Sequence, residues 1–243
     1  MRESKHVLAK KPWHILAKPE DVAERVIVAG DPLRVSRISK LLEEPKLVNE
    51  HRGYLVYTGK YKGIDVSIAT HGIGAPSAAI VFEELLMLGA RIMVRLGTCG
   101  GLKDYIELGS VVVPIGALYE PGGTIGMYTQ GCCYPAVADP EVVLKLEEKL
   151  EGHGFKVFRG LAASSDAFHA EEEYSKKWSG LNAIAVEMEC ATLFTLARLK
   201  GFKAGAALMV IDNLATGEAM KADTVGELAD KTAKAILDAI IEV

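Results

Sequence analysis

Short apolar segments alternate with helical segments along most of the chain, and this alternation constrains the fold more than any other feature. Segments with the length and composition of strands are 25–30, 54–58, 64–70, 92–96, 111–114, 155–163, 183–186 and 204–211. Segments expected to be helical are 32–42, 76–88, 140–151, 171–178 and 224–241. A further helix is expected after the segment 183–192, ending near residue 200. This order predicts an α/β fold with a largely parallel sheet.

Polar and glycine-rich clusters follow six of the expected strands. They lie at 30–34, 71–77, 95–101, 164–169, 187–189 and 212–213. Because ligands of α/β sheets bind outside the carboxyl ends of the strands, we expect the six clusters to build one site. The segment 119–130, rich in glycine and aromatic residues, is expected to be a long loop. We find no internal repeat or linker, so residues 1–243 are interpreted as one domain, with 1–12 as a flexible N-terminal extension.

The composition limits the classes of protein to consider. A formal net charge of −4 argues against a general nucleic-acid surface, and no apolar run approaches the length that spans a bilayer. The basic N-terminus lacks the apolar core of a signal peptide, so a cytoplasmic location is expected. The four cysteines form neither a disulfide framework nor a metal-binding pattern: we expect Cys99 and Cys190 in the core, and Cys132 and Cys133 free in a loop.

One group of candidate residues suits a phosphate. The candidates at or beside strand ends are Gly30, Arg34, Arg95 and Thr98. Backbone N–H groups at glycine turns, a hydroxyl group and guanidinium groups together bind anions well. Arg95 interrupts the apolar segment 92–96, where a guanidinium needs a fixed anion. The alternative is an ion pair with an acidic residue of the chain, namely Glu187, Glu189 or Asp31.

Two carboxylates, Glu187 and Glu189, follow the apolar strand 183–186 and precede more core-forming sequence. Carboxylates in such surroundings destabilise the fold unless protein groups or ligand hydroxyls satisfy them. Two interpretations stay open from these residues alone. The pair either caps the N-terminus of the next helix, whose dipole favours negative charge, or serves a binding site.

Two further strand ends carry candidates. Asp212, followed by Asn213, comes directly after the last apolar strand and is a candidate general acid or base; the alternative is that it caps a turn. Phe168 follows the polar segment 164–166 and either stacks on a flat ligand or lies in the core.

The segment 72–77 begins like a dinucleotide-binding GxGxxG motif, but the match is incomplete. The third glycine is replaced by Ser77, and the position about 20 residues further on is Arg91, not an acid. We therefore reject a dehydrogenase. His71, just before this segment, is interpreted as a turn residue that takes no direct part in chemistry.

Several stretches, taken together, match a known family. They are Gly30-Asp-Pro-Leu-Arg34, His51-Arg-Gly53, Tyr57-Thr-Gly-Lys-Tyr-Lys-Gly63, Thr70-His-Gly-Ile-Gly74, Arg95-Leu-Gly-Thr-Cys-Gly100, Ser164-Ser-Asp166, Val186-Glu-Met-Glu189 and Ile211-Asp-Asn213. In this order they resemble the nucleoside phosphorylases of the purine nucleoside and uridine phosphorylase superfamily, in the hexameric branch. They are most similar to the archaeal-type enzymes for purine nucleosides and 5′-methylthioadenosine. The resemblance implies a single-domain, three-layer fold with a mixed, partly barrel-like central sheet flanked by helices.

The resemblance also implies a role for each candidate. Residues implied to bind phosphate are Gly30, Arg34, Arg52, Arg95 and Thr98. Residues implied to bind the ribose are His14, Met188 and Glu189. Residues implied to contact the base are Phe168, Glu187 and Asn213, with Glu187 alternatively a partner for Arg95. The implied catalytic residues are Asp212 and Glu189. His14 and Arg52 would reach the neighbouring site of a homohexamer, a trimer of dimers.

The implied reaction is phosphorolysis of a purine nucleoside, which gives free base and ribose 1-phosphate or its methylthio analogue. Inorganic phosphate is the co-substrate, and no other cofactor and no metal is implied. Phosphate stabilises and attacks an oxocarbenium-like sugar, and Glu189 orients the sugar hydroxyls. Asp212 can donate a proton to the departing purine only if burial or a nearby anion raises its pKa.

Departures from the family pattern bear on the substrate. Uridine phosphorylases carry a Gln and an Arg in the region that matches 170–174, which here holds neither, so uridine is disfavoured. Many bacterial purine enzymes place an Arg after the catalytic Asp, whereas 214–225 has only Lys221. A methylthioadenosine nucleosidase of the same fold would not need three phosphate arginines, and a non-catalytic relative would have lost a site residue. Neither alternative fits the chain as well, and the preferred nucleoside stays open.

Overall fold

The computed structural model describes residues 11–243, so most of the expected extension 1–12 lies outside the described residues. The strands are β1 (Arg25–Ala29), β2 (Glu43–Asn49), β3 (Val56–Tyr61), β4 (Ile64–Thr70), β5 (Ile92–Gly101), β6 (Val111–Tyr119), β7 (Val157–Ser164), β8 (Ala183–Glu187), β9 (Lys203–Asn213) and β10 (Glu218–Ala219). The helices are α1 (Pro32–Ile38), α2 (Ala75–Met87), α3 (Gly123–Thr129), α4 (Pro140–Gly152), α5 (Glu171–Gly180), α6 (Cys190–Lys200) and α7 (Val225–Ile240). Short 3-10 helices lie at Pro19–Asp21, Ser39–Leu41, His51–Gly53, Phe168–Ala170 and Ala222–Thr224.

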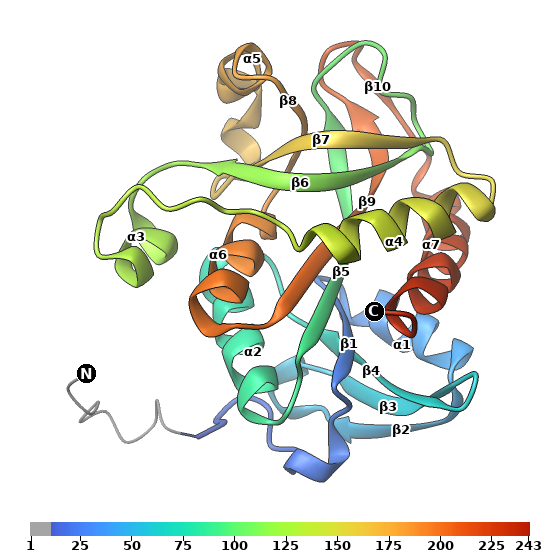
Figure 1. Cartoon of the computed structure of the whole chain (residues 1–243). Coiled ribbons are helices and arrows are strands. Elements are labelled where there is room, and N and C mark those ends of the chain that lie inside the picture. Colours follow the sequence, from blue (N-terminus) through green and yellow to red (C-terminus); the bar gives the residue numbers. More distant parts are fainter. Residues whose placement is uncertain (1–10) are drawn as a thin grey trace.

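The strands form one sheet in the order β10-β9-β6-β7-β8-β5-β1-β4-β3-β2 (Figure 1). Because β5 pairs with both β8 and β9, the strands β9, β6, β7, β8 and β5 close into a ring. Parallel pairs such as β1–β5 and β6–β7 occur beside antiparallel pairs such as β3–β4 and β6–β9. The expectation of a largely parallel sheet is therefore wrong, and the mixed, partly barrel-like sheet implied by the resemblance is confirmed.

Strand β5 joins the ring to the rest of the sheet and is longer than the expected 92–96. It pairs along its length with β9, so the segment expected to be a glycine-rich turn is in fact strand. Two of its glycines allow functional side chains to lie close to the strand backbone. A Cβ on Gly97 would lie 1.4 Å from Nη1 of Arg95, and one on Gly100 would lie 3.1 Å from Oδ2 of Asp212. The absence of side chains at these two positions leaves room for functional groups beside the strand.

Helices cover the sheet on two sides. Helix α6 packs against β6, β7 and β9 of the ring with α2 beside it, and α4 and α7 lie together on another side of the ring (Figure 1). Asp139 begins α4 by accepting a hydrogen bond from the N–H of Glu141 at 3.1 Å, with Pro140 in the first helical position. Asp31 caps α1 as expected, accepting from the N–H of Leu33 at 2.8 Å.

Helix α3 and strand β2 differ from the sequence-based expectation, and the two-residue strand β10 was not expected either. Helix α3 lies within 119–130, the segment expected to be a loop, because Ile125 is buried in the main core and anchors one helical turn despite the glycines around it. Strand β2 was not anticipated because it is almost entirely exposed and has no alternation of apolar and polar residues. It pairs only with β3, at one end of the sheet.

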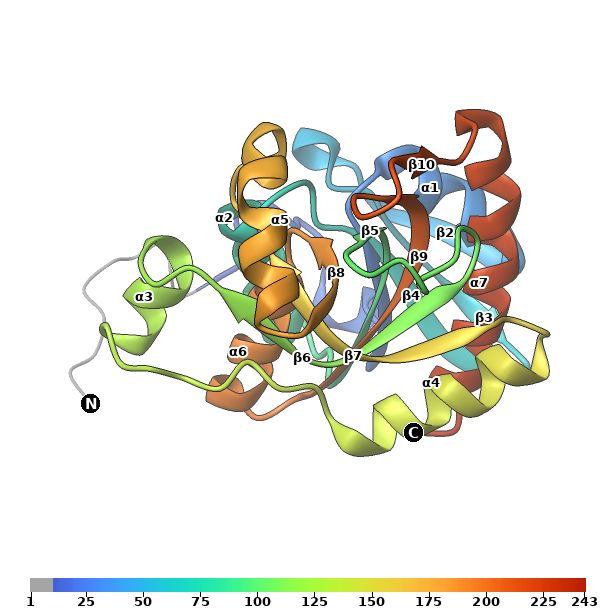
Figure 2. The same cartoon turned by 90° about the horizontal axis from the view of Figure 1, so that it is seen from above.

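Helix α5 packs against a small apolar cluster that is separate from the main core. The members of this cluster are Leu102, Ala163, Trp178, Ala183 and Val186. Seen from above, α5 lies over β8, near the mouth of the ring (Figure 2). Trp178 is its main anchor and stacks on Tyr174 with the ring centroids 5.5 Å apart.

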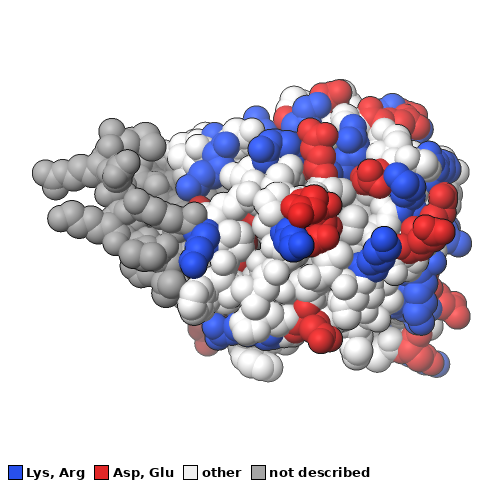
Figure 3. All heavy atoms as spheres, turned by 90° about the horizontal axis from the view of Figure 1, so that it is seen from below, with Lys and Arg blue, Asp and Glu red and all other residues white. Residues whose placement is uncertain are grey.

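The surface carries both signs of charge. On the face seen in Figure 3, basic and acidic side chains are interspersed, and neither sign forms a continuous patch. Within residues 11–243, no helix combines the length and the apolar character needed to cross a membrane. All four cysteines are free, with Cys99 and Cys190 buried and Cys132 and Cys133 exposed, as expected.

Candidate active site

A cavity of about 460 Å³ opens at the ends of β1, β5, β8 and β9. This volume lies in the range of small-molecule sites. Residues from all six of the polar clusters line it. Of the candidate residues, those in its wall are Gly30, Arg34, Arg95, Thr98, Phe168, Glu187, Met188, Glu189 and Asp212. The crossing of strands in the ring therefore brings together groups that are up to 182 positions apart in the chain (Gly30 to Asp212).

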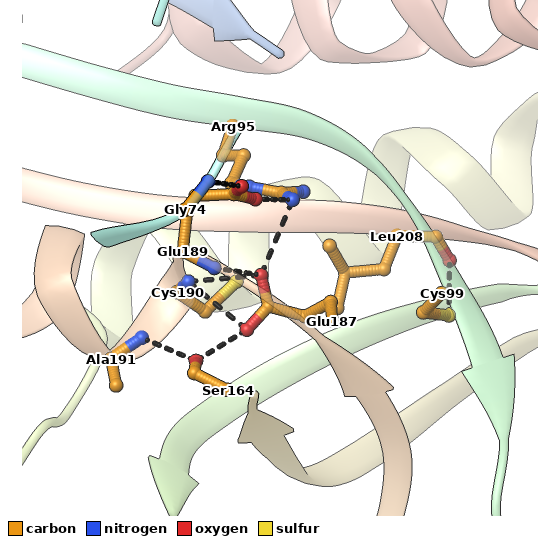
Figure 4. Close-up of polar contacts among 9 residues, drawn as sticks. All are labelled: Gly74, Arg95, Cys99, Ser164, Glu187, Glu189, Cys190, Ala191 and Leu208. Carbon is orange, nitrogen blue, oxygen red and sulfur yellow. Dashed lines mark hydrogen bonds and ion pairs between the residues drawn. The ribbon is translucent and has the colours of Figure 1, made fainter. Parts of the chain in front are cut away.

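Arg95 is the centre of a buried ion cluster (Figure 4). Its Nη2 donates a hydrogen bond to Oε2 of Glu189 and lies 3.3 Å from Oε2 of Glu187. Burial alone would lower the pKa of Arg95, but the two carboxylates outweigh burial and raise it. Burial opposes ionisation of Glu189 as well, yet the charge of Arg95 holds the pKa of this carboxyl below its usual value. The ion pair considered as an alternative from the sequence is thus present.

Glu187 caps helix α6. Its carboxylate accepts hydrogen bonds from the backbone N–H groups of Glu189 at 2.8 Å and Cys190 at 2.9 Å, and from the Ser164 hydroxyl. With Arg95 in addition, both carboxylate oxygens are occupied by protein donors. The expected contact of Glu187 with a base is therefore not supported, because no acceptor is left free for it.

Glu189 has a different role from its neighbour. Its Oε1 accepts a hydrogen bond of 2.6 Å from the N–H of Gly74, where the N-terminus of α2 favours negative charge. A positive φ of 84° at Gly74 turns this N–H toward the carboxylate. Of the two interpretations left open, capping holds for Glu187, whereas the Glu189 side chain faces the cavity beside Met188.

Several buried polar atoms next to this cluster have no partner within residues 11–243. They include Nε and Nη1 of Arg95, both ring nitrogens of His71 and the hydroxyl of Thr70. Burial lowers the pKa of His71 to about 4, so its ring is neutral, and it packs edge-on against Phe82. Burial also lowers the pKa of Arg34, which lines the same part of the cavity. We call this part, defined by Arg34, Arg95 and Glu189, the arginine end.

Asp212 lies in another part of the cavity. It belongs to β9 itself and pairs with Ala219 of β10, so it does not follow the strand as expected. Burial raises the pKa of its carboxyl, and among residues 11–243 no cation offsets this effect. Phe168 lies in the same wall and is 64% exposed, which excludes a place in the core.

Asn213 is directed away from the cavity. Its side-chain amide donates to the carbonyl oxygens of Lys103 at 2.9 Å and Ile106 at 2.8 Å, and its Oδ1 accepts from the N–H of Ala215 at 2.8 Å. The expected contact with a base is not supported, because this amide is used to hold two loops together.

Sequence reasoning missed one lining residue, Glu171. It is the first residue of α5, is 9% exposed and faces the same region as Asp212. No signal in the sequence separates it from Glu172 and Glu173, which follow it and are exposed. We call the region defined by Phe168, Glu171 and Asp212 the carboxyl end.

His14 and Arg52 also lie outside the cavity. The Nδ1 of His14 lies 2.7 Å from Oε1 of Glu84, whose other oxygen accepts from the backbone N–H groups of His14 and Ile15. Arg52 is exposed, with a left-handed φ of 56°. The expectation that both reach a neighbouring site remains a prediction.

Comparison with known proteins gives a consistent assignment. The family model of the phosphorylase superfamily matches residues 24–242. A guanosine phosphorylase of Halorubrum lacusprofundi is 42% identical over 225 residues, which cover 92% of each chain. A uridine phosphorylase of Thermococcus kodakarensis is 38% identical over 243 residues, covering 90% of this chain and 86% of the relative. A DeoD-type purine nucleoside phosphorylase of Exiguobacterium sp. is 34% identical over 233 residues, covering 95% and 98%. The chain therefore belongs to the phosphorylase superfamily.

Proposed function

We propose that the protein catalyses the phosphate-dependent cleavage of purine nucleosides to free base and ribose 1-phosphate. One observation carries the proposal. A single cavity combines two arginines, a carboxylate held in place by Gly74, and an Asp212 carboxyl that has no cationic partner in the described part of the chain. Two of the relatives have names that specify guanosine or purine nucleosides, which supports a purine substrate.

The arginine end suits phosphate and ribose. Arg95 keeps Nε and Nη1 free while Nη2 holds Glu189, so a phosphate oxygen can be bound without breaking that ion pair. Glu189 would accept hydrogen bonds from ribose hydroxyls, and Met188 would pack beneath the sugar. A phosphate held close to C1′ both stabilises the developing positive charge of the sugar and attacks it.

The carboxyl end suits the leaving base. Phe168 offers an exposed aromatic face for stacking. As the bond from C1′ to the base breaks, negative charge collects on the purine, and a proton donor near N7 accelerates departure. The raised pKa of Asp212 increases the fraction of its carboxyl that carries this proton near neutral pH.

Charge balance supports a contribution from a second subunit. Within one chain, Arg34 and Arg95 are matched by Glu187 and Glu189, so a phosphate dianion would leave the arginine end with excess negative charge. Arg52 is exposed and has no salt bridge within residues 11–243, which fits the predicted reach into a neighbouring site of a hexamer. Mixing Arg52→Ala subunits with Asp212→Asn subunits should restore turnover that neither variant has alone. Lack of restoration in verified mixed oligomers would contradict the shared site.

The direct test is a substrate panel with and without phosphate. Guanosine, inosine, adenosine, 5′-methylthioadenosine and uridine are incubated with the enzyme, and released base is measured chromatographically. We expect release from purine nucleosides only when phosphate is present. Release at equal rates in phosphate-free buffer would indicate a nucleosidase, preference for uridine would indicate a uridine phosphorylase, and no release from any substrate would reject the proposal.

A further inference from the structure

The side chain of Glu171 is buried in the carboxyl end although it begins a surface helix. It is 9% exposed, whereas the next two residues of α5, Glu172 and Glu173, are exposed to solvent. Its carboxyl group lines the cavity together with Phe168 and Asp212. The chain therefore directs one of three consecutive glutamates toward the space in which the base would lie.

No cation compensates this carboxyl group within residues 11–243. The charged groups that face it are Asp212 and Glu187, both acidic, and a hydrogen bond with Ser165 offsets part of their effect. Burial, and then repulsion from these two acids, raises the pKa of Glu171 to about 7. A buried carboxylate with one hydrogen bond and no cationic partner is destabilising, and a ligand that supplies hydrogen-bond donors would offset this cost.

The bases of common nucleosides differ in what they offer to a carboxylate. The Watson–Crick edge of guanine presents two adjacent donors, N1–H and the 2-amino group, which match the two oxygens of a carboxylate. Hypoxanthine presents N1–H alone. Adenine has an acceptor at N1, and the N3–H of uracil lies between two carbonyl oxygens that a carboxylate repels. Charge-assisted pairs of this kind are stronger than neutral hydrogen bonds.

We propose that Glu171 reads the Watson–Crick edge of the base and selects guanosine over inosine and adenosine. The proposal rests on the proposed function, because it assigns a substrate preference to the same cavity. In this arrangement the base stacks on Phe168, with its imidazole side toward Asp212 and its N1 edge toward Glu171. One end of the cavity thus holds two carboxyl groups with separate tasks, one for recognition and one for proton donation.

The test compares Glu171→Gln with Glu172→Gln, a matched change at an exposed position of the same helix turn. A glutamine offers one acceptor and one donor, so it clashes with one of the two donors of guanine. At saturating phosphate, we expect Glu171→Gln to lower kcat/KM for guanosine by about 10- to 100-fold and for inosine by about 3- to 10-fold. Adenosine should change by less than about 3-fold, and Glu172→Gln should change none of the three.

Equal losses for all three nucleosides, or no change for any of them, would overturn the assignment. A second measurement needs neither a variant nor turnover. Calorimetric titration of the wild-type protein with guanine, hypoxanthine and 1-methylguanine, each with phosphate present, should give the tightest binding for guanine and a loss of about 10-fold or more for 1-methylguanine. Equal affinity for guanine and 1-methylguanine would reject the role of Glu171. Failure of phosphorolysis with all nucleosides would reject the proposed function and leave this binding test intact.

Discussion

The arginine end and the carboxyl end of the cavity are supported by different parts of the fold. Arg95 and Glu189 sit where β5, α2 and α6 meet, inside the main apolar core, and their side chains are locked by an ion pair and a backbone hydrogen bond. Phe168 and Glu171 belong to a segment that rests on the small cluster around Trp178. The end that would hold phosphate and ribose is rigid, whereas the end that would hold the base depends on one short helix. This difference suits a family whose members share phosphate and ribose but differ in base.

The sharpest test of the arginine end compares its two adjacent glutamates. Glu189→Gln should lower kcat/KM by about 1000-fold, because the group that orients the ribose loses its charge. It should also lower the free energy of unfolding, because the buried guanidinium of Arg95 loses one of its two carboxylate partners. Glu187→Gln removes the charged cap of α6 and should lower the free energy of unfolding by about 1–3 kcal/mol. Activity assays and thermal unfolding of both variants are the measurements. A fully active Glu189→Gln enzyme, or a Glu187→Gln variant as stable as the wild type, would contradict the separation of roles.

A second change tests how closely the arginine end is packed. Gly97→Ala would place a methyl group 1.4 Å from Nη1 of Arg95 and displace the guanidinium. We expect kcat/KM to fall by about 100-fold, with a raised KM for phosphate, because a phosphate donor is lost. Gly152→Ala is the control, since a Cβ there meets no atom within 4 Å. Unchanged phosphate KM in Gly97→Ala would show that Arg95 does not bind phosphate from its present position.

Nucleoside binding at the carboxyl end should weaken when the packing of α5 is disturbed. Trp178→Ala removes the main anchor of α5, and we expect the nucleoside KM to rise about 10-fold while the phosphate KM stays unchanged. Amide hydrogen exchange should accelerate in α5 and stay slow in β5. Lys176→Ala, at an exposed position of the same helix, is the control. Equal acceleration in both elements would show that the two ends unfold as one unit.

The smallest expected effect is a dependence of stability on pH. The pKa of Glu171 is raised from 4.5 to about 7 in the folded protein, so between these values the folded state binds more protons than the unfolded state. The free energy of unfolding should therefore fall as pH rises from 4.5 to 7. Denaturant titrations of wild type and Glu171→Gln across this window measure the difference. Parallel pH profiles for the two proteins would argue against a raised pKa at Glu171.

The arginine end was largely predictable from the sequence, and the carboxyl end was not. Arg95 stands out because a charge within an apolar strand demands a partner, and Gly30, Arg34 and Glu189 stand at recognisable strand ends. The ends of strands are marked by changes in composition, and the topology of the ring then brings them together.

The errors have physical causes too. Glu171 is one of three identical residues at the start of a helix, and only the docking of α5 decides which one is buried. Asn213 follows a strand as the other candidates do, but the direction of its side chain depends on two loops distant in sequence. Which of two adjacent glutamates caps a helix and which faces the cavity also depends on a tertiary contact, the N–H of Gly74.

The outermost strand, β2, has a consequence for the behaviour of the protein in solution. A sheet with free edges can recruit strands from other molecules and grow into aggregates. Here one edge, β10, is only two residues long, and the other, β2, carries Pro45, which lacks an N–H, and the charged Glu43, Glu44 and Lys46. The pairing of β2 with β3 is irregular, and Glu44 has a left-handed φ of 47°. Both features make β2 a less regular edge for another strand to pair with. The edges of the sheet thus protect the protein from uncontrolled polymerisation at high concentration.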